Sequence, residues 1–91
     1  MEKDKISPYK ILLYPLMGEK ATMLREAENK LTFVVDKNAD KEDIKRAVEE
    51  LYAVKVKKVN TMITIKGKKR AHIKLADEYN AEEVASQFGV L

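Results

Sequence analysis

The sequence contains no cysteine, a single histidine, two prolines and three glycines in 91 residues. Without cysteine the chain forms neither a disulfide nor a thiolate zinc site, and this composition suits a reducing, intracellular setting. One histidine cannot build a histidine cluster or a histidine-based triad within the chain. The glycines are isolated from one another, so no glycine loop that cradles phosphate is present. We therefore expect no metal site, no cofactor and no enzyme.

The acidic residues do not suggest a catalytic pair either. Asp77 with Glu78, and Glu82 with Glu83, are adjacent in the sequence. Adjacent positions on a helix do not face each other, so these side chains are expected to be solvated or to cap helices. The acids therefore leave the expectation of a non-catalytic protein unchanged.

Long hydrophobic runs are also absent. The apolar stretches are far shorter than the roughly 20 residues that span a bilayer. The first ten residues, MEKDKISPYK, are charged and lack the apolar segment of a signal peptide. The sequence thus predicts a cytoplasmic protein without direct membrane insertion. Its length suits a single domain over residues 1–91, with residues 1–10 as a loose N-terminal arm.

One stretch of the chain lacks acids altogether. Residues 53–75 contain eight Lys or Arg and no Asp or Glu, whereas the other 68 residues hold 10 basic and 15 acidic side chains. The stretch carries +8 beside a remainder of −5, although the whole chain is only +3. Such asymmetry points to a polyanionic partner on one face. The alternative is a solvated strand whose lysines protect a sheet edge against aggregation. That alternative explains any two of these cations well, but it explains all eight less well.

Hydrophobic periodicity predicts an α+β domain. The expected order is β-α-β-α-β-β-α, with a mostly antiparallel four-stranded sheet and helices packed on it. Pro15 limits the first strand, within residues 11–17, to a short or edge position. A helix is expected over residues 19–28, ended by Asn29 in a left-handed conformation.

Capping signals mark the two later helices. Asp40, followed three residues later by Asp43, resembles a capping box and begins a helix that extends to about Tyr52. Asn80 is expected to cap the last helix, and Gly89 is expected to end it.

The basic stretch is predicted to contain a β-hairpin. The residues expected to face the core are even-numbered before Lys57 and odd-numbered after Lys58. A regular strand cannot make this change, so a β-bulge is predicted there. If Ile63 and Ile65 share the core face with Ala71 and Ile73, a turn of three or five residues around Gly67 is favoured over a simple two-residue turn. The outer row is then Asn60, Met62, Thr64, Lys66, Arg70, His72 and Lys74.

The predicted hairpin contains no aromatic residue. It therefore lacks the stacking platform with which proteins hold single-stranded RNA. A cationic face of this kind suits folded RNA, recognised through phosphates and shape. The lone His72 would be a plain surface residue, or one that stacks on RNA if RNA is present.

Three phrases of the sequence carry a family resemblance: YPLMGEKATML, KLTFVVDKNADKEDIKRAVEELYAVKVKKVNT and KGKKRAHIKL. Together they resemble the universal large-subunit ribosomal protein number twenty-three family over about residues 11–75, and the tail resembles the archaeal form. The resemblance implies an rRNA-binding protein at the polypeptide exit tunnel of the large subunit. It also implies a docking platform for signal recognition particle and the translocation channel.

The resemblance also implies roles for individual residues. Glu19 and Lys20 stand in the family's Pro-x-x-Ser/Thr-Glu-Lys motif, and Glu19 would contact partner factors. A first-turn acid favoured by the helix dipole is an equally good reading of Glu19. Asn60 and Thr61 stand in the Val-Asn-Thr motif, and strand-end hydrogen bonds to the backbone are the alternative there. Gly18 replaces the family's usual hydroxyl residue, and the hairpin turn is short, so a tunnel-lining role is not implied.

The leading hypothesis is a structural constituent of the large ribosomal subunit, in contact with large-subunit rRNA and neighbouring ribosomal proteins. The alternative is a non-ribosomal adaptor whose basic hairpin binds an acidic protein. The candidate RNA-binding residues are Lys10, Lys20, Lys55, Lys57, Lys58, Asn60, Thr61, Lys66, Lys68, Lys69, Arg70, His72 and Lys74.

Overall fold

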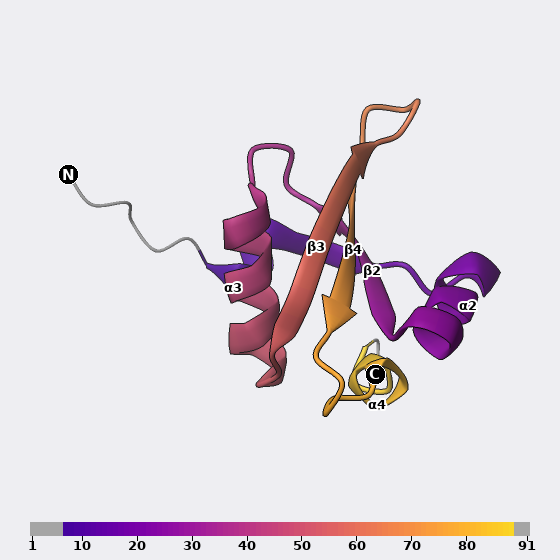
Figure 1. Cartoon of the computed structure of the whole chain (residues 1–91). Coiled ribbons are helices and arrows are strands. Elements are labelled where there is room, and N and C mark those ends of the chain that lie inside the picture. Colours follow the sequence, from indigo (N-terminus) through magenta and orange to yellow (C-terminus); the bar gives the residue numbers. More distant parts are fainter. Residues whose placement is uncertain (1–6, 89–91) are drawn as a thin grey trace.

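Four antiparallel strands form the sheet of this protein, in the order β1-β2-β4-β3. The computed structural model describes residues 7–88 (Figure 1). The elements are α1 (Pro8–Ile11), β1 (Leu12–Pro15), α2 (Glu19–Glu28), β2 (Lys30–Val35), α3 (Lys41–Tyr52), β3 (Val56–Ile63), β4 (Lys69–Leu75) and α4 (Ala81–Ala85). The predicted α+β class and its element order are confirmed, with the short α1 added before the first strand.

Residues 7–11, before β1, form a short capped helix. The Ser7 hydroxyl accepts a hydrogen bond from the backbone N–H of Tyr9 at 3.3 Å, and Pro8 occupies the first helical position. Proline suits that position because its backbone angle is preset and its missing N–H would have no helical partner. The prediction of a loose arm is therefore wrong for residues 7–10. Residues 1–6 lie outside the described part of the chain.

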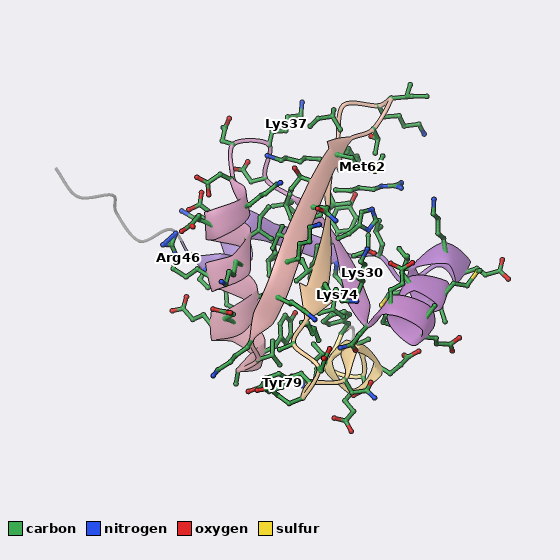
Figure 2. All side chains as sticks on the ribbon, in the orientation of Figure 1. Lys30, Lys37, Arg46, Met62, Lys74 and Tyr79 are labelled. Carbon is green, nitrogen blue, oxygen red and sulfur yellow. The ribbon has the colours of Figure 1, made fainter. Side chains whose placement is uncertain are left out.

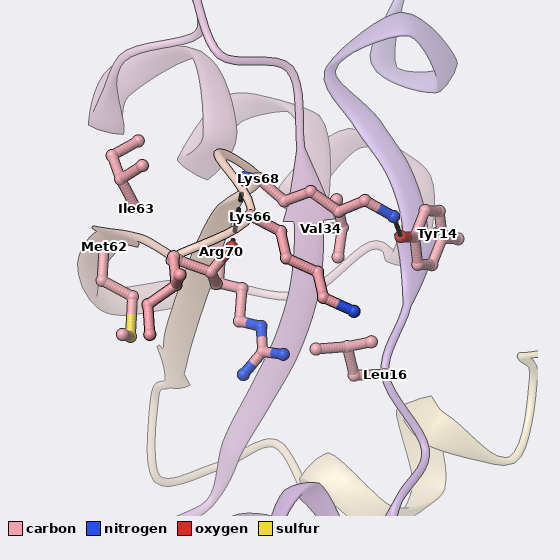
Figure 3. Close-up of a pocket in the computed structure, with 10 residues that line it drawn as sticks. Tyr14, Leu16, Val34, Met62, Ile63, Lys66, Lys68 and Arg70 are labelled. Carbon is pink, nitrogen blue, oxygen red and sulfur yellow. Dashed lines mark hydrogen bonds between the residues drawn. The ribbon is translucent and has the colours of Figure 1, made fainter.

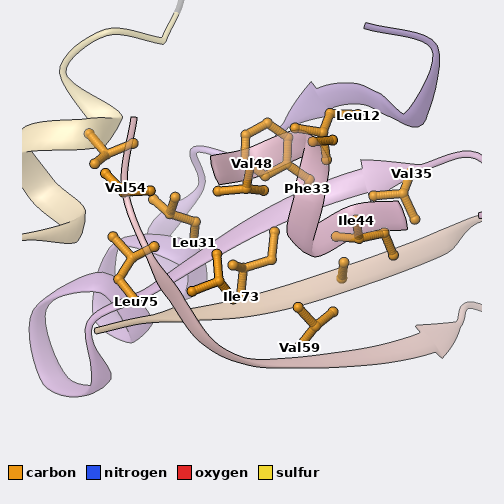
Figure 4. Packing of buried hydrophobic residues seen from close by; sticks show 14 of the residues in the cluster. Leu12, Leu31, Phe33, Val35, Ile44, Val48, Val54, Val59, Ile73 and Leu75 are labelled. Atoms are coloured by element: carbon orange, nitrogen blue, oxygen red, sulfur yellow. The ribbon is translucent and has the colours of Figure 1, made fainter. Parts of the chain in front are cut away.

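The core lies between one face of the sheet and α3. Leu31, Phe33 and Val35 of β2 point to this side, as do Ala71 and Ile73 of β4 (Figure 4). They pack against the apolar stripe of α3, which is Ile44, Ala47 and Val48. In Figure 1, α3 lies on one side of the strands and α2 on the other. The second face of the sheet is thus only partly covered.

An aromatic cluster of Phe33, Tyr52 and Phe88 packs at the end of the core near α4. The ring centroids of Phe33 and Phe88 are 5.2 Å apart, and those of Tyr52 and Phe88 are 5.3 Å apart. Both pairs are arranged edge to face. Phe88 follows α4, so the cluster ties the C-terminal segment to β2 and α3. Edge-to-face pairs of this kind add to the stabilisation that burial provides.

Two of the predicted caps are present. The Asp40 carboxylate accepts from the backbone N–H of Asp43 at 2.8 Å, and Asp43 accepts from Asp40 at 3.2 Å. Asn80 Oδ1 accepts from the N–H groups of Glu82 and Glu83. The last helix is shorter than predicted, because it ends at Ala85 and gives way to turns. Gly89 itself lies outside the described residues.

The hairpin has the predicted irregularities. The pairing of β3 with β4 shifts between Val56 and Lys58, which leaves Lys57 as the bulged residue. Ile63 pairs with Lys69, so a five-residue turn joins the strands, with Gly67 at a φ of 83°. The bulge and the odd-numbered turn are therefore confirmed.

The assignment of Ile63 and Ile65 to the core is wrong. Ile63 is 60% exposed and Ile65 is fully exposed, whereas Ala71 and Ile73 are completely buried. The reason is the length of the hairpin. β2 ends opposite Lys69, and the hairpin projects beyond it, so no neighbouring strand flanks the turn. Alternation fixes which face a side chain joins, but burial requires something to cover that face.

Candidate nucleic-acid interface

Three rows of side chains cross the face of the sheet opposite α3. The pairings of β3, β4 and β2 define them as Lys58, Lys74 and Lys30; Asn60, His72 and Thr32; and Met62, Arg70 and Val34. We call this surface the outer face. Figure 2 labels Lys30, Lys74 and Met62 on it. The predicted outer row of the hairpin is therefore continued onto β2.

The first row is cationic and lies beside the end of α2. Lys74 Nζ donates to the backbone carbonyl of Glu28 at 3.1 Å, and Lys30 Nζ lies 2.9 Å from the Glu28 carboxylate. The hydrogen bond and charge of Lys30 hold the pKa of Glu28 below its ordinary value. Cations are favoured at this position because a helix C-terminus carries partial negative charge. Sequence reasoning missed Lys30, since only the register of β2 with β4 places it beside Lys74.

The middle row is centred on the single histidine. His72 Nδ1 lies 3.2 Å from Thr32 Oγ1, and the imidazole is partly buried. Burial, followed by the charges of Lys30, Lys20 and Arg70, lowers the pKa of His72 below its ordinary value. His72 is thus a neutral, hydrogen-bonded member of the outer face near pH 7, and not a plain surface residue.

The third row opens into a groove at the hairpin end, with a volume of about 570 Å³ (Figure 3). We call it the hairpin groove; it is lined by Tyr14, Leu16, Val34, Met62, Ile63, Thr64, Ile65, Lys66, Lys68 and Arg70. Lys68 Nζ donates to the Tyr14 hydroxyl at 3.0 Å, which fastens the turn to the end of β1. The groove therefore combines apolar side chains with three cations.

A second hollow of about 350 Å³ adjoins the groove and reaches the start of α2. Leu16, Met62 and Arg70 line both hollows. Here the structure brings Glu19 and Lys20 beside Arg70 and His72, which are about 50 residues away in the sequence. Gly18 provides no side-chain cap, as expected from the missing hydroxyl. The motif acid and the basic hairpin thus belong to one continuous surface.

Other candidate residues lie apart from the outer face. Lys69 lies on the core side of β4, where its Nζ donates to the Ala39 carbonyl at 2.7 Å. Thr61 pairs with Ala71 on that same core side, and Lys10 lies in α1, which packs against α3. Lys55 and the bulged Lys57 lie at the entry to β3, and Lys57 is 3.9 Å from Asp77.

The described residues hold no group of three or more His, Asp or Glu side chains that could bind a metal ion. None of the helices between residues 7 and 88 is both long and apolar enough to cross a membrane.

The fold and the outer face together define a class: a small α+β binding domain with a cationic sheet face. Comparison with known proteins identifies the class more closely. The family model described as Ribosomal protein L23 matches residues 10–83. The chain is 52% identical over 82 residues to the large ribosomal subunit protein uL23 of Methanococcus aeolicus, and 49% identical to that of Methanococcus vannielii. Each alignment covers 90% of this chain and 95% of the relative.

The chain therefore belongs to the ribosomal protein L23 family, of the archaeal type. It is a protein of the large ribosomal subunit in the cytoplasm, and this family is structural and not enzymatic. Ribosomal RNA and other ribosomal proteins are accordingly its class of partners. The resemblance found in the sequence is confirmed, and membership favours the ribosomal hypothesis over the adaptor.

Proposed function

We propose that the protein binds large-subunit rRNA through the outer face, near the polypeptide exit tunnel. The observation that carries this proposal is the absence of acids from residues 53–75, which supply most of the cations of that face. Lys58 and Lys74 lie side by side in the first row, and Arg70 lies in the third row, four residues or about 13 Å from Lys74 along β4. Cations spread over a strand face whose own segment contains no acid suit the phosphates of an RNA backbone.

The cations differ in how free they are to meet phosphate. Among residues 7–88, Lys66 and Arg70 make no ion pair, whereas Lys74 and Lys30 are already held at the end of α2. Lys20 extends the same surface through the second hollow. We therefore assign the main phosphate contacts to Lys58, Lys66, Lys68 and Arg70, with Lys20 beside them.

We further propose that Glu19 contributes to a docking site for factors that meet the nascent chain. It is exposed in the first turn of α2 and lies at the rim of the second hollow. Signal recognition particle and the translocation channel are the partners that the family resemblance implies. Because Glu19 adjoins Arg70 and His72, docking and RNA binding would occupy neighbouring parts of one surface.

Salt dependence tests the RNA assignment. Binding of the full chain to large-subunit rRNA should weaken as salt rises, with log affinity falling by up to about 0.9 per phosphate neutralised, as in duplex DNA. Lys66→Gln and Arg70→Gln should each lower the affinity and reduce the salt slope. Lys45→Gln, which removes an exposed cation from α3, should do neither. Binding that ignores salt, or that Lys45→Gln weakens equally, would contradict the assignment.

A further inference from the structure

We propose that the hairpin groove holds an unstacked nucleotide of the bound RNA, with its base on the apolar floor and its phosphate at the cationic rim. This proposal rests on the proposed RNA binding and adds what kind of RNA element the surface takes. The residues that would contact this nucleotide come from β1, β2 and the hairpin.

The floor of the groove consists of apolar side chains, although the chain as a whole is rich in charged residues. Val34 forms its base and is 5% exposed, while Met62 in the same row remains 48% exposed. Leu16, half-buried, continues the floor toward α2. Met62 faces solvent at the hairpin end of the outer face, on the edge strand β3, where a hydrophilic side chain would fit equally well. A contiguous exposed apolar patch of this kind commonly marks a binding site.

The rim of the groove favours an anionic occupant. Lys66, Lys68 and Arg70 line it, and none of its ten lining residues is acidic. Lys66 and Arg70 have no ion-pair partner among the described residues, as noted above. A nucleotide offers both an apolar face and a phosphate, so it complements the floor and the rim together.

Tyr14 provides a stacking group at one end of the groove. Tyr14 is 42% exposed, and its hydroxyl accepts a hydrogen bond from Lys68, whose Nζ also lies 5.6 Å from the ring centroid. The ring is thereby oriented before RNA arrives, and such preorganisation favours binding. The tertiary structure thus places an aromatic group beside the hairpin, which has none of its own.

A regular duplex would use only part of this site. Its backbone could reach the cations of the rim, but its stacked bases would leave the floor exposed to water. Sequence-specific RNA recognition usually involves loops, bulges and ends whose bases are unstacked. The combination of floor, rim and ring therefore favours an element with at least one unpaired nucleotide.

The test compares variants of the full chain in binding to large-subunit rRNA over a range of salt concentrations. Tyr14→Ala should lower the affinity about fivefold or more, since one base contact with an aromatic group is of that order. Met62→Ala should also lower it, because it removes part of the apolar floor. Their salt slopes should match that of the parent, because no phosphate contact is removed. Tyr14→Phe keeps the ring but loses the hydrogen bond from Lys68, so its affinity should lie between those of Tyr14→Ala and the parent. Met23→Ala removes a methionine that is 61% exposed on α2 and serves as the matched control.

Chemical probing of the same complexes at nucleotide resolution identifies the occupant. At least one unpaired base should be protected by the parent and by Met23→Ala, and exposed again with Met62→Ala. If Tyr14→Ala and Met62→Ala bind and protect the RNA as the parent does, the groove takes no base, although the proposed RNA binding stands. If these variants lose only a neighbouring ribosomal protein, the occupant is a protein and the inference is overturned. If the parent itself shows no salt-dependent binding, the proposed function fails first.

Discussion

The Lys69 ammonium lies 2.7 Å from the carbonyl oxygen of Ala39, so one cation of the basic hairpin is used inside the molecule. Its neighbour Arg70 points to the opposite face of the sheet and lines the hairpin groove. Adjacent residues of a strand alternate between faces, so two consecutive cations here have different tasks. Lys69 anchors the loop before α3, and Arg70 is available to a partner.

Lys69→Gln should therefore lower the stability of the fold. A hydrogen bond from a charged donor to a partly buried carbonyl contributes about 1–2 kcal/mol to the free energy of unfolding. Lys66→Gln, in the exposed turn, should change it by less than about 0.5 kcal/mol. Urea unfolding of both variants measures the difference. Equal stabilities would mean that the contact with Ala39 contributes nothing. Charge changes meant to probe RNA binding should thus avoid Lys69.

Asn29 should stabilise the packing of α4 through its side chain. It ends α2 at a φ of 57°, its Nδ2 donates to the Tyr79 carbonyl at 2.8 Å, and its Oδ1 accepts from the Ala81 N–H at 2.8 Å. Asn29→Gly keeps the left-handed conformation but removes both hydrogen bonds, so it should cost about 1–3 kcal/mol. Asn29→Ala should cost about 1 kcal/mol more, because alanine disfavours this conformation. Thermal unfolding that ranks the two variants equally would contradict the backbone part of this argument.

Ala53 should be a site where glycine is stabilising. It ends α3 at a φ of 56° and its side chain is exposed, so glycine would relieve the left-handed strain without losing packing. Ala53→Gly should raise the free energy of unfolding by about 0.5–1 kcal/mol. The control, Ala27→Gly, lies on the exposed side of α2 and should lower it by about 1 kcal/mol. A loss of stability in Ala53→Gly would show that this αL position is not strained.

His72 should make stability depend on pH near neutrality. Its pKa is lowered in the folded protein, so the unfolded chain binds more protons as the pH falls through the ordinary value of about 6.5. The free energy of unfolding should therefore decrease as the pH falls from about 7.5 to about 5.5. Because the chain has one histidine, His72→Gln should remove this dependence. Parallel pH profiles for parent and variant would contradict the assignment to His72.

Local signals predicted much of the fold because they act within a few residues. The pair of Asp40 and Asp43 forms the capping box that its spacing indicated, and Asn29 ends α2 in the left-handed conformation expected of asparagine. The core-facing positions switch from even to odd numbers at Lys57, and the strand has a bulge there. The switch requires a bulge because side chains alternate strictly along a regular strand, so one extra residue must be inserted. The family resemblance likewise depended on contiguous phrases of sequence.

The same local signals failed where a neighbour distant in the sequence decides the outcome. Arg25 lies on α2 and is 9% exposed, because its Nε donates to Glu82 at 3.1 Å across to α4. Helical periodicity placed apolar residues on the packed side of α2 and did not indicate a buried arginine. Ile63 and Ile65 have the parity of core residues, yet nothing covers the projecting end of the hairpin.

The sequence by itself determined the class of the fold, the extents of α2 and α3, the bulge and the odd-numbered turn of the hairpin, and the concentration of positive charge in residues 53–75. Each of these follows from backbone preferences or from composition, which need no distant partner. Only the tertiary structure decided how that charge is used. The sheet order β1-β2-β4-β3 adds Lys30 to the outer face and brings Tyr14 to Lys68, and the loop before α3 provides the carbonyl partner of Lys69. The physical reason is that strand register is a long-range property, fixed by the packing of the whole core.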